Sequence, residues 1–426
     1  MLKSVRPITA TVVATVCVAT SAALASPSHA DPVVASNPAV ITSWNATAAR
    51  TILTENAVPV PASALYFGFV SIAMYDAVVA IEGGYEPYAE QPRAHAHASP
   101  EVAAATAAYR TLKYFFPASA DNLAADYATS LAGIPNGVGI EHGKRVGEAA
   151  ADALIALRQN DGRGNAAITL NVVEEPGLWR PTPAAFAPMA VPWLGFVRPL
   201  ALTSPTQISL PGPDDIDTPE YAADFAEVKA YGVQAGSSRS TAQTDTAMFW
   251  AANPVLQYQV ALRAQVTSRG LDILDSSRAF ALLGTSTGDA LVACWRAKFD
   301  YKYWRPITGI RLADKDENDA TLPDTGWTSL VPNPPYPDYT SGHACVSGAA
   351  SNTFSHLFGA SSIDLNVPSL GAAASRHYDT AAALDEETMN ARIWLGIHFR
   401  KAMTDGNRLG HQVSDWTIAH YFEPSD

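Results

Sequence analysis

Three short stretches in the second half of the chain combine cationic, hydroxyl and imidazole side chains in an order that suits oxyanion chemistry. The central stretch reads YPDYTSGHACVSGAA and places Ser341, Gly342 and His343 at the start of an Ala- and Gly-rich segment that we predict to be helical. Ser341 can cap this helix, and Gly342 allows its backbone to approach a ligand closely. The N–H groups of a first helical turn bind anions, and a histidine can move protons near neutral pH. The pattern predicts an anion site with an acid–base group beside it.

The preceding stretch, Trp295 to Pro306, supplies two cations. Lys298 and Arg305 are seven residues apart, a spacing that brings two side chains to nearly the same face of one helix. The stretch is also rich in aromatic residues such as Phe299, which indicates a buried face rather than a solvated one. We therefore expect both cations to converge on one anion.

The following stretch, Asn390 to Arg400, contains an apolar segment that is interrupted by Arg392 and His398. Six residues along one straight helix would direct these two side chains to different faces. We therefore expect the helix to break near Gly396, so that both can reach the same site.

Together the three stretches offer three cations, a hydroxyl, a backbone amide and two imidazoles, which suit a tetrahedral oxyanion. One histidine can attack or coordinate the central atom while the other transfers protons. The candidate site residues are Lys298, Arg305, Ser341, Gly342, His343, Arg392 and His398.

Lys-(six residues)-Arg-Pro, Ser-Gly-His and Arg-(five residues)-His, in this order, resemble the motifs of the vanadium-dependent haloperoxidase and type 2 phosphatidic-acid phosphatase superfamily. The chain is most similar to the soluble bacterial and fungal haloperoxidase branch. Further similarity lies at Tyr75 to Ala77, Asp161-Gly162, Pro176 to Trp179 and Phe249-Trp250.

The resemblance implies that the cofactor is vanadate, held by the three cations, Ser341 and the Gly342 amide. It also implies that His398 bonds to the vanadium and that His343, opposite, is the acid–base residue. The implied reaction is oxidation of a halide by hydrogen peroxide, followed by halogenation of a small organic acceptor. Trp295 and Tyr336 are secondary candidates for the halide pocket.

The chain departs from the family pattern at three positions. Thr340 replaces a proline, Ala391 replaces a serine, and Ala402 stands where an aspartate usually follows the last histidine. A carboxylate behind a histidine fixes its tautomer and raises its basicity. We therefore expect His398 to be less well oriented, unless the chain turns so that Asp405 takes this place.

Two alternative functions use the same residues. In a soluble acid phosphatase the site would hold phosphate, His398 would form a phosphohistidine intermediate, and His343 would protonate the leaving group. In an inactive relative the site would only bind an oxyanion. The aromatic surroundings favour the haloperoxidase, and the missing carboxylate at Ala402 favours the inactive relative.

The composition of the chain limits the class of protein that contains these residues. The chain has 426 residues, of which 48% are hydrophobic and 16% charged, as in ordered proteins with a large core. Its net charge of −13 argues against binding of nucleic acid or docking on anionic membranes. Cations that hold an anion must therefore be gathered locally.

Periodicity predicts an all-α protein. The family resemblance further implies two halves that each resemble a four-helix bundle. The N-terminal half is 31–219, and the C-terminal half, 220–426, carries the oxyanion site. We predict helices at 43–81 (broken at Pro59 and Pro61), 100–116, 119–131, 138–159, 221–231, 240–250, 258–270 and 272–302. Many prolines and tryptophans between 166 and 219 predict an irregular segment packed over the helices. We find no alternating strand pattern.

Residues 1–30 are typical of a secretory signal peptide, with Lys3 and Arg6 before an apolar stretch of small residues. We expect a secreted protein with no membrane span after the signal is removed. Of the three cysteines, Cys294 and Cys345 remain in the mature chain; they can pair or pack separately, and we favour packing. The sequence does not predict an oligomeric state.

Overall fold

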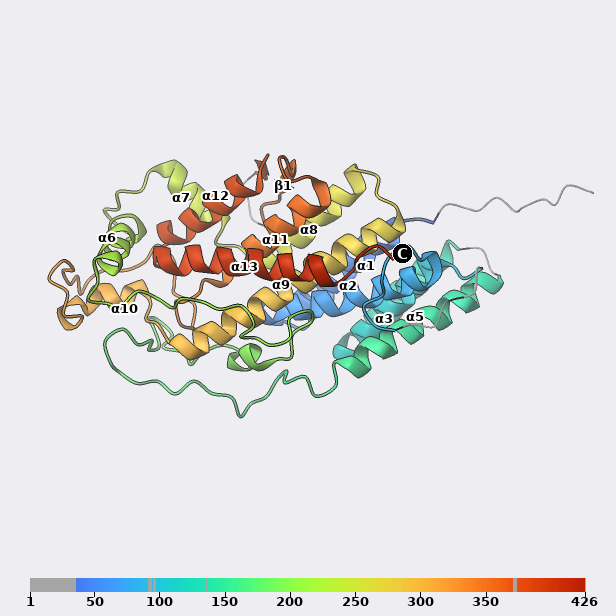
Figure 1. The fold of residues 1–426 in the computed structure, drawn as a ribbon, viewed down its shortest axis with the longest axis horizontal. Coiled ribbons are helices and arrows are strands. Elements are labelled where there is room, and N and C mark those ends of the chain that lie inside the picture. Colours follow the sequence, from blue (N-terminus) through green and yellow to red (C-terminus); the bar gives the residue numbers. More distant parts are fainter. Residues whose placement is uncertain (1–35, 91–93, 95–96, 135–136, 371–373, 426) are drawn as a thin grey trace, which may run out of the picture. The chain divides into compact units, whose positions relative to one another are not determined.

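The computed structural model describes residues 36–90, 94, 97–134, 137–370 and 374–425; the predicted signal peptide lies outside them. As predicted, the described chain is mainly helical (Figure 1). The α-helices are α1 (Ala39–Ala49), α2 (Val60–Glu82), α3 (Pro100–Phe115), α4 (Ala120–Ala132), α5 (Val138–Leu157), α6 (Pro219–Gly232), α7 (Thr241–Phe249), α8 (Pro254–Ser268), α9 (Ile273–Tyr301), α10 (Pro306–Arg311), α11 (Gly342–Phe358), α12 (Ala381–Trp394) and α13 (Arg400–His420). A π-helical segment, Arg50–Glu55, continues α1.

The helices group into two bundles that meet at α2 and α9. Helices α2, α3, α4 and α5 pack together in the first half, and α9, α11, α12 and α13 in the second. The largest contact between the two groups joins α2 to α9, which lie side by side (Figure 1). The predicted boundary at 219/220 remains a prediction.

Close approach of α2 and α9 depends on glycine. A Cβ atom added to Gly284 would lie 2.9 Å from the Cα of Gly68, closer than such atoms pack. Both helices are buried on most sides because their residues are apolar or small. In the described part of the chain α2 alone is long and apolar enough to cross a membrane, and 83% of its most apolar 18 residues are buried.

The segment between α5 and α6 is irregular and packed, as its prolines predict. It contains one short 3-10 helix, Pro192–Phe196, which lies against α9. Trp179 and Leu194 are buried. The Asp289 carboxylate on α9 accepts hydrogen bonds from the backbone N–H groups of Leu200, Ala201 and Leu202. A buried carboxylate thus fixes the segment to the helix that carries Lys298.

One small sheet was not predicted. Strands β1 (Leu365–Val367) and β2 (Arg376–Tyr378) form an antiparallel pair between α11 and α12. Each strand has three residues, which is too short for an alternating pattern to stand out in the sequence.

Candidate functional site

Lys298 and Arg305 do not share a helix, contrary to the sequence prediction. Helix α9 ends at Tyr301, because Lys302 adopts a left-handed conformation with φ of 52°. Arg305 is the N-cap residue of the next helix, α10, whose first residue is Pro306. Proline is favoured at this first position, since its missing N–H is not needed there. The two cations converge because the chain turns between two helices.

The Lys298 ammonium is fully buried and donates to two backbone carbonyls, those of Pro337 (2.7 Å) and Asp338 (3.0 Å). An ammonium group has three donors, so one remains for a ligand. Burial lowers the pKa of Lys298 to about 8. A bound anion would offset this loss of hydration and favour the charged form.

The Arg305 guanidinium is also fully buried, and the protein engages only part of it. Its Nε donates to the Tyr336 carbonyl (2.8 Å), and its Nη1 donates to the Ile397 carbonyl (2.6 Å) and lies 3.2 Å from Nε2 of His398. Its Nη2 is buried with no hydrogen-bond partner among the described residues. A buried, unpartnered guanidinium nitrogen is costly unless a ligand accepts from it.

Ser341 caps α11, as predicted: its hydroxyl accepts from the N–H of Ala344, and its own N–H donates to the Ala402 carbonyl (2.9 Å). Gly342 has a second role that the sequence does not reveal. A Cβ atom added there would lie 3.0 Å from the Trp295 ring. Glycine therefore allows the indole to pack against the start of α11.

His343 lies at the open side of the site. It is partly buried, as is Gly342, whereas the three cations and His398 are buried. Its Nε2 lies 3.2 Å from the carbonyl oxygen of Ala252. A carbonyl can only accept, so Nε2 carries the proton and Nδ1 is the nitrogen with a free lone pair. Burial, and then the charge of Arg392, hold the pKa of His343 well below its ordinary value.

The predicted break between Arg392 and His398 is confirmed. Helix α12 ends at Trp394, Gly396 has φ of 76°, and α13 starts at Arg400. Arg392 donates from Nη1 to the Trp250 carbonyl (2.8 Å), while its Nε is buried with no partner among the described residues. Burial lowers the pKa of Arg392.

His398 is almost fully buried, and burial followed by the charge of Arg305 holds its pKa well below the ordinary value. The further causes of this shift are Lys298, Arg392 and His343, so the structure brings all of the predicted charged residues together.

One carboxylate of the site was missed. Asp338 is fully buried, and its Oδ1 lies 2.7 Å from Nδ1 of His398. This contact has the length of a hydrogen bond, although its angle is bent away from good alignment. A carboxylate therefore lies beside His398, although neither position 402 nor Asp405 supplies it. The only signal in the sequence is an acidic residue between Pro337 and Tyr339, five positions before His343.

Asp405 does not take the place of the carboxylate behind His398. Its carboxylate accepts from the Tyr339 hydroxyl (2.8 Å) and from Arg408 (2.9 Å), and it also lies 3.3 Å from the Lys401 ammonium. Both of its oxygens thus already have partners on α13 and at Tyr339.

Two aromatic rings flank the cations. Trp295 and Tyr336 have ring centroids 4.9 Å apart, and the Lys298 ammonium lies 5.6 Å and 5.0 Å from these two centroids. The Trp295 Nε1 donates to the Ala190 carbonyl (3.2 Å), so the irregular segment also orients this ring.

Cys294 and Cys345 are buried free thiols beside Thr340, in agreement with the packing that we favoured. The Cys294 thiol donates to the Thr340 carbonyl (3.3 Å), and the Cys345 sulfur lies 3.4 Å from the Thr340 hydroxyl.

The donor set fits a tetrahedral oxyanion. Three buried cations lie together, and the two arginines each retain a buried nitrogen without a partner in the described chain. Ser341 and the first amides of α11 add neutral donors. The Asp338 carboxylate compensates part of the charge, and an oxyanion would compensate more of it.

Comparison with known proteins agrees with this arrangement. Residues 278–425 match the family model of the VCPO second helical-bundle domain. Vanadium chloroperoxidase of Curvularia inaequalis is 32% identical over 142 residues, which cover 28% of this chain and 23% of that protein. The match therefore spans less than a quarter of the relative's length.

Two solved structures are similar over almost the whole chain. A bacterial vanadium-dependent iodoperoxidase superimposes with a TM-score of 0.79 and 22% identity, covering 91% of this chain and 98% of the other. A holo-type bacterial vanadium-dependent chloroperoxidase gives 0.70 and 17%, covering 90% and 97%. The superfamily resemblance of the three motifs and the helical fold are confirmed.

Proposed function

We propose that this chain, which shares the superfamily and the fold of the bacterial vanadium haloperoxidases, is itself a vanadium-dependent haloperoxidase that oxidises a halide with hydrogen peroxide. One observation carries the proposal. The Arg305 Nη1 group, 3.2 Å from Nε2 of His398, can only donate, so Nε2 is unprotonated and lies beside three buried cations; its lone pair accepts from Arg305 and would turn to a ligand once an oxyanion takes over that donor. A lone pair next to an oxyanion site suits coordination of the central atom.

The residues that would hold vanadate are those predicted from the sequence. The Lys298, Arg305 and Arg392 side chains would neutralise its charge, the Ser341 hydroxyl and Gly342 amide would donate to its oxygens, and Nε2 of His398 would be the metal ligand. When bound, vanadate would supply activation of hydrogen peroxide toward a halide.

His343 would hold and move the proton. Its Nε2–H is fixed on the Ala252 carbonyl, so Nδ1 is free to accept a proton from a reactant. Its low pKa keeps the imidazole neutral near pH 7, the form in which it acts as a base. Its partly exposed position lies where peroxide and an organic acceptor would arrive.

The Trp295 and Tyr336 rings would form the halide side of the site. Ring edges carry partial positive charge and attract anions, and the Lys298 ammonium lies within 6 Å of both ring centroids. The signal-like residues 1–30 support export of the enzyme. The acidic charge of the chain supports small-molecule partners rather than nucleic acid.

The test uses the purified mature protein, freed of phosphate and divided in two. One sample receives orthovanadate, bromide, hydrogen peroxide and a chromogenic bromine acceptor; the other receives a chromogenic phosphate monoester without vanadate. Bromination that requires vanadate supports the proposal. Ester hydrolysis without bromination would instead identify a phosphatase that uses the same histidines. Absence of activity in both samples would identify an inactive relative that only binds an oxyanion.

A variant separates turnover from binding. His343→Ala removes the proton-transferring imidazole but none of the cations, so we expect loss of at least about 100-fold in turnover, the usual contribution of general acid–base catalysis. Vanadate affinity, measured by equilibrium dialysis, should remain within a few-fold of the wild type. Loss of affinity to the same extent as turnover would show that His343 has another role.

A further inference from the structure

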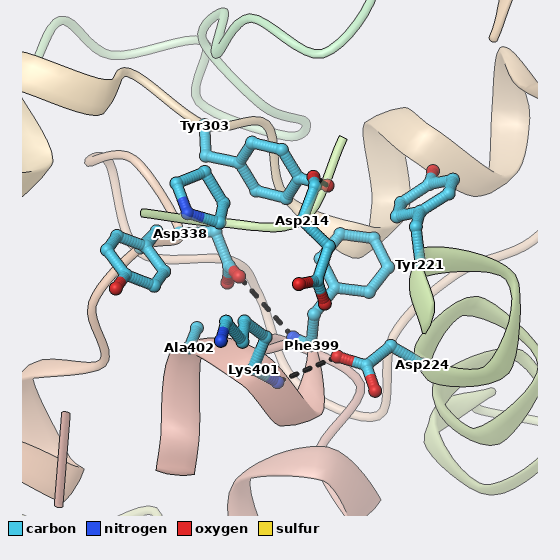
Figure 2. A pocket seen from close by; sticks show the side chains of 10 residues that line it. Asp214, Tyr221, Asp224, Tyr303, Asp338, Phe399, Lys401 and Ala402 are labelled. Carbon is cyan, nitrogen blue, oxygen red and sulfur yellow. Dashed lines mark hydrogen bonds between the residues drawn. The ribbon is translucent and has the colours of Figure 1, made fainter. Parts of the chain in front are cut away.

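Asp338 is held in place by contacts along its whole length. Its N–H donates to the Tyr303 carbonyl (2.9 Å), and its own carbonyl accepts from Lys298 (3.0 Å). Its Oδ2 accepts from the N–H of Phe399 (3.4 Å), just after His398, as Figure 2 shows. Its Oδ1 lies 2.7 Å from Nδ1 of His398, at an angle bent away from good hydrogen-bond alignment.

The positions of the neighbours determine where the proton of His398 resides. Arginine has only donors, so the Arg305 Nη1 group at 3.2 Å requires Nε2 of His398 to be unprotonated. A neutral imidazole then carries its proton on Nδ1, and a carboxylate is the acceptor that this N–H needs. Asp338 is the carboxylate at that nitrogen.

The local packing explains why this carboxylate comes from the loop rather than from α13. Asp338 and Ala402 line the same small cavity, of about 10 Å³, together with Asp224 and Lys401 (Figure 2). Ala402 contributes only a methyl group to this cavity, whereas the loop before Ser341 contributes the Asp338 carboxylate. The carboxylate three residues beyond Ala402, Asp405, is engaged elsewhere.

We propose that Asp338 is the positioning residue of the site: it holds the proton of His398 on Nδ1 and thereby leaves Nε2 unprotonated, as a ligand for the central atom of the oxyanion. The proposal rests on the oxyanion site of the proposed function, but not on the reaction that occurs there. It assigns to Asp338 the orienting role for which the sequence offered only Ala402 and Asp405.

The first experiment determines the tautomer without any ligand. Long-range ¹H–¹⁵N correlation spectra of histidine-labelled protein distinguish Nδ1–H from Nε2–H, and His398→Gln identifies the signal. We expect Nδ1–H in the wild type and a mixture of tautomers, or Nε2–H, in Asp338→Ala. A wild-type His398 protonated on Nε2 would overturn the proposal.

The second experiment compares two anions by calorimetry. Sulfate depends on the cations alone, whereas vanadate also needs the lone pair of His398. Loss of a residue that orients a metal ligand typically costs about 10–100-fold in affinity. We therefore expect Asp338→Ala to weaken vanadate binding by this factor and sulfate binding by less than about threefold. Equal losses for both anions, or no loss for vanadate, would refute the positioning role.

Asp224→Asn is the matched control. The Asp224 carboxylate lines the same cavity and accepts from the N–H of Lys401 (2.7 Å), as Asp338 accepts from Phe399, so both cap the start of α13. We expect this variant to bind vanadate like the wild type; a loss as large as that of Asp338→Ala would assign the effect to the helix start and overturn the proposal. If Asp338→Ala does not fold, Asp338→Asn enters the same comparison. Absence of bromination with intact vanadate binding would refute the proposed function and leave the role of Asp338 standing.

Discussion

Raising the pH should weaken anion binding through Lys298 in a way that one substitution abolishes. Burial lowers the pKa of this amine to about 8, so the ammonium is present below pH 8 and is lost as the pH rises above it. Binding of an anion requires the ammonium. The affinity should therefore fall as the pH rises above 8.

The size of the effect follows from linkage. Where one proton must be taken up for binding, the affinity falls about tenfold for each pH unit above the pKa, or about 1.4 kcal/mol. The fall ends when the remaining contribution of the charged hydrogen bond, about 1.5–3 kcal/mol, has been lost. The total loss should therefore be about 10–150-fold between pH 7 and pH 10.

Calorimetric titration with sulfate measures this dependence, because sulfate remains a dianion over the whole range. In Lys298→Met the affinity should already be low at pH 7 and should not fall further up to pH 9. Burial raises the pKa of the neighbouring Cys294 thiol, but the Cys345 thiol and the Lys298 ammonium outweigh it and lower that pKa to about 7. Cys294→Ser therefore serves as the control, and it should keep the wild-type slope above pH 8.

Two results would refute this reasoning. A wild-type affinity that does not change between pH 7 and pH 9.5 would show that the Lys298 charge does not contribute. A slope that persists in Lys298→Met but disappears in Cys294→Ser would assign the titration to the thiol.

Two further predictions concern stability. Gly284→Ala should lower the thermal midpoint, because the added Cβ would lie 2.9 Å from the Gly68 backbone. Such overpacking costs about 1–3 kcal/mol, more than the roughly 1 kcal/mol gained in helix propensity. Gly133→Ala, with open space around it, should change the midpoint little, and equal midpoints for both variants would contradict the close packing of α2 and α9. Burial alone would lower the pKa of His411, but the hydrogen bond and charge of Asp385 outweigh burial and raise that pKa. This pair therefore stabilises the fold below about pH 6.5, and the stabilisation is lost as the pH rises through the raised pKa. Denaturant titrations at pH 6 and pH 8 should show a larger difference in the wild type than in His411→Gln, and an equal difference would exclude the pair as its source.

The fold was predictable where periodicity is strong. Helices such as α3 and α5 follow from apolar residues at three- and four-residue steps, and prolines mark the irregular segment between α5 and α6. The two three-residue strands carry no such pattern. The contact of Gly68 with Gly284 was not predictable either, because it joins two helices more than two hundred residues apart.

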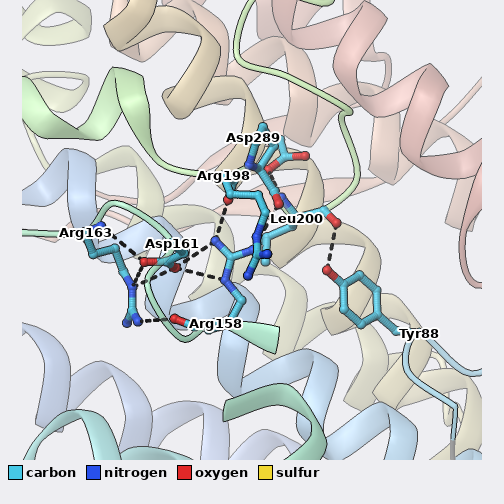
Figure 3. A network of polar contacts seen from close by, with 8 residues as sticks. Tyr88, Arg158, Asp161, Arg163, Arg198, Leu200 and Asp289 are labelled. Atoms are coloured by element: carbon cyan, nitrogen blue, oxygen red, sulfur yellow. Dashed lines mark hydrogen bonds and ion pairs between the residues drawn. The ribbon is translucent and has the colours of Figure 1, made fainter. Parts of the chain in front are cut away.

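The contacts of the buried ion cluster around Asp161 were likewise not predictable from the sequence. The sequence shows Asp161-Gly162 as a helix end with arginines nearby, but not their partners. In the structure the Arg158 and Arg163 guanidinium groups both contact the Asp161 carboxylate, and Arg158 also donates to the carbonyl oxygens of Arg198 and Pro199 (Figure 3). Which distant backbone a buried arginine meets depends on the packing of the whole domain.

In the candidate site the residue types were predictable and their supports were not. Spacing and chemistry selected the cations, Ser341 and the two histidines. The assumption of one helix for Lys298 and Arg305 failed because Lys302 adopts a left-handed conformation, which side-chain spacing does not reveal. Asp338 was overlooked because its role depends on a contact with His398, sixty residues away, and the carbonyls that hold His343 and Arg392 carry no side-chain signal at all.

The cluster of three buried cations also makes the folded protein a sensor of the anions in its solution. Lys298, Arg305 and Arg392 repel one another and lack part of their hydration, so the native state without an anion is less stable than the same fold with one. Any tetrahedral oxyanion that binds only the native state adds stability in proportion to the logarithm of its concentration, about 2.7 kcal/mol at one hundred times its dissociation constant. The melting temperature of this protein should therefore depend on the anions of its buffer, and on the proposed function phosphate in that buffer would compete with vanadate for the same cations.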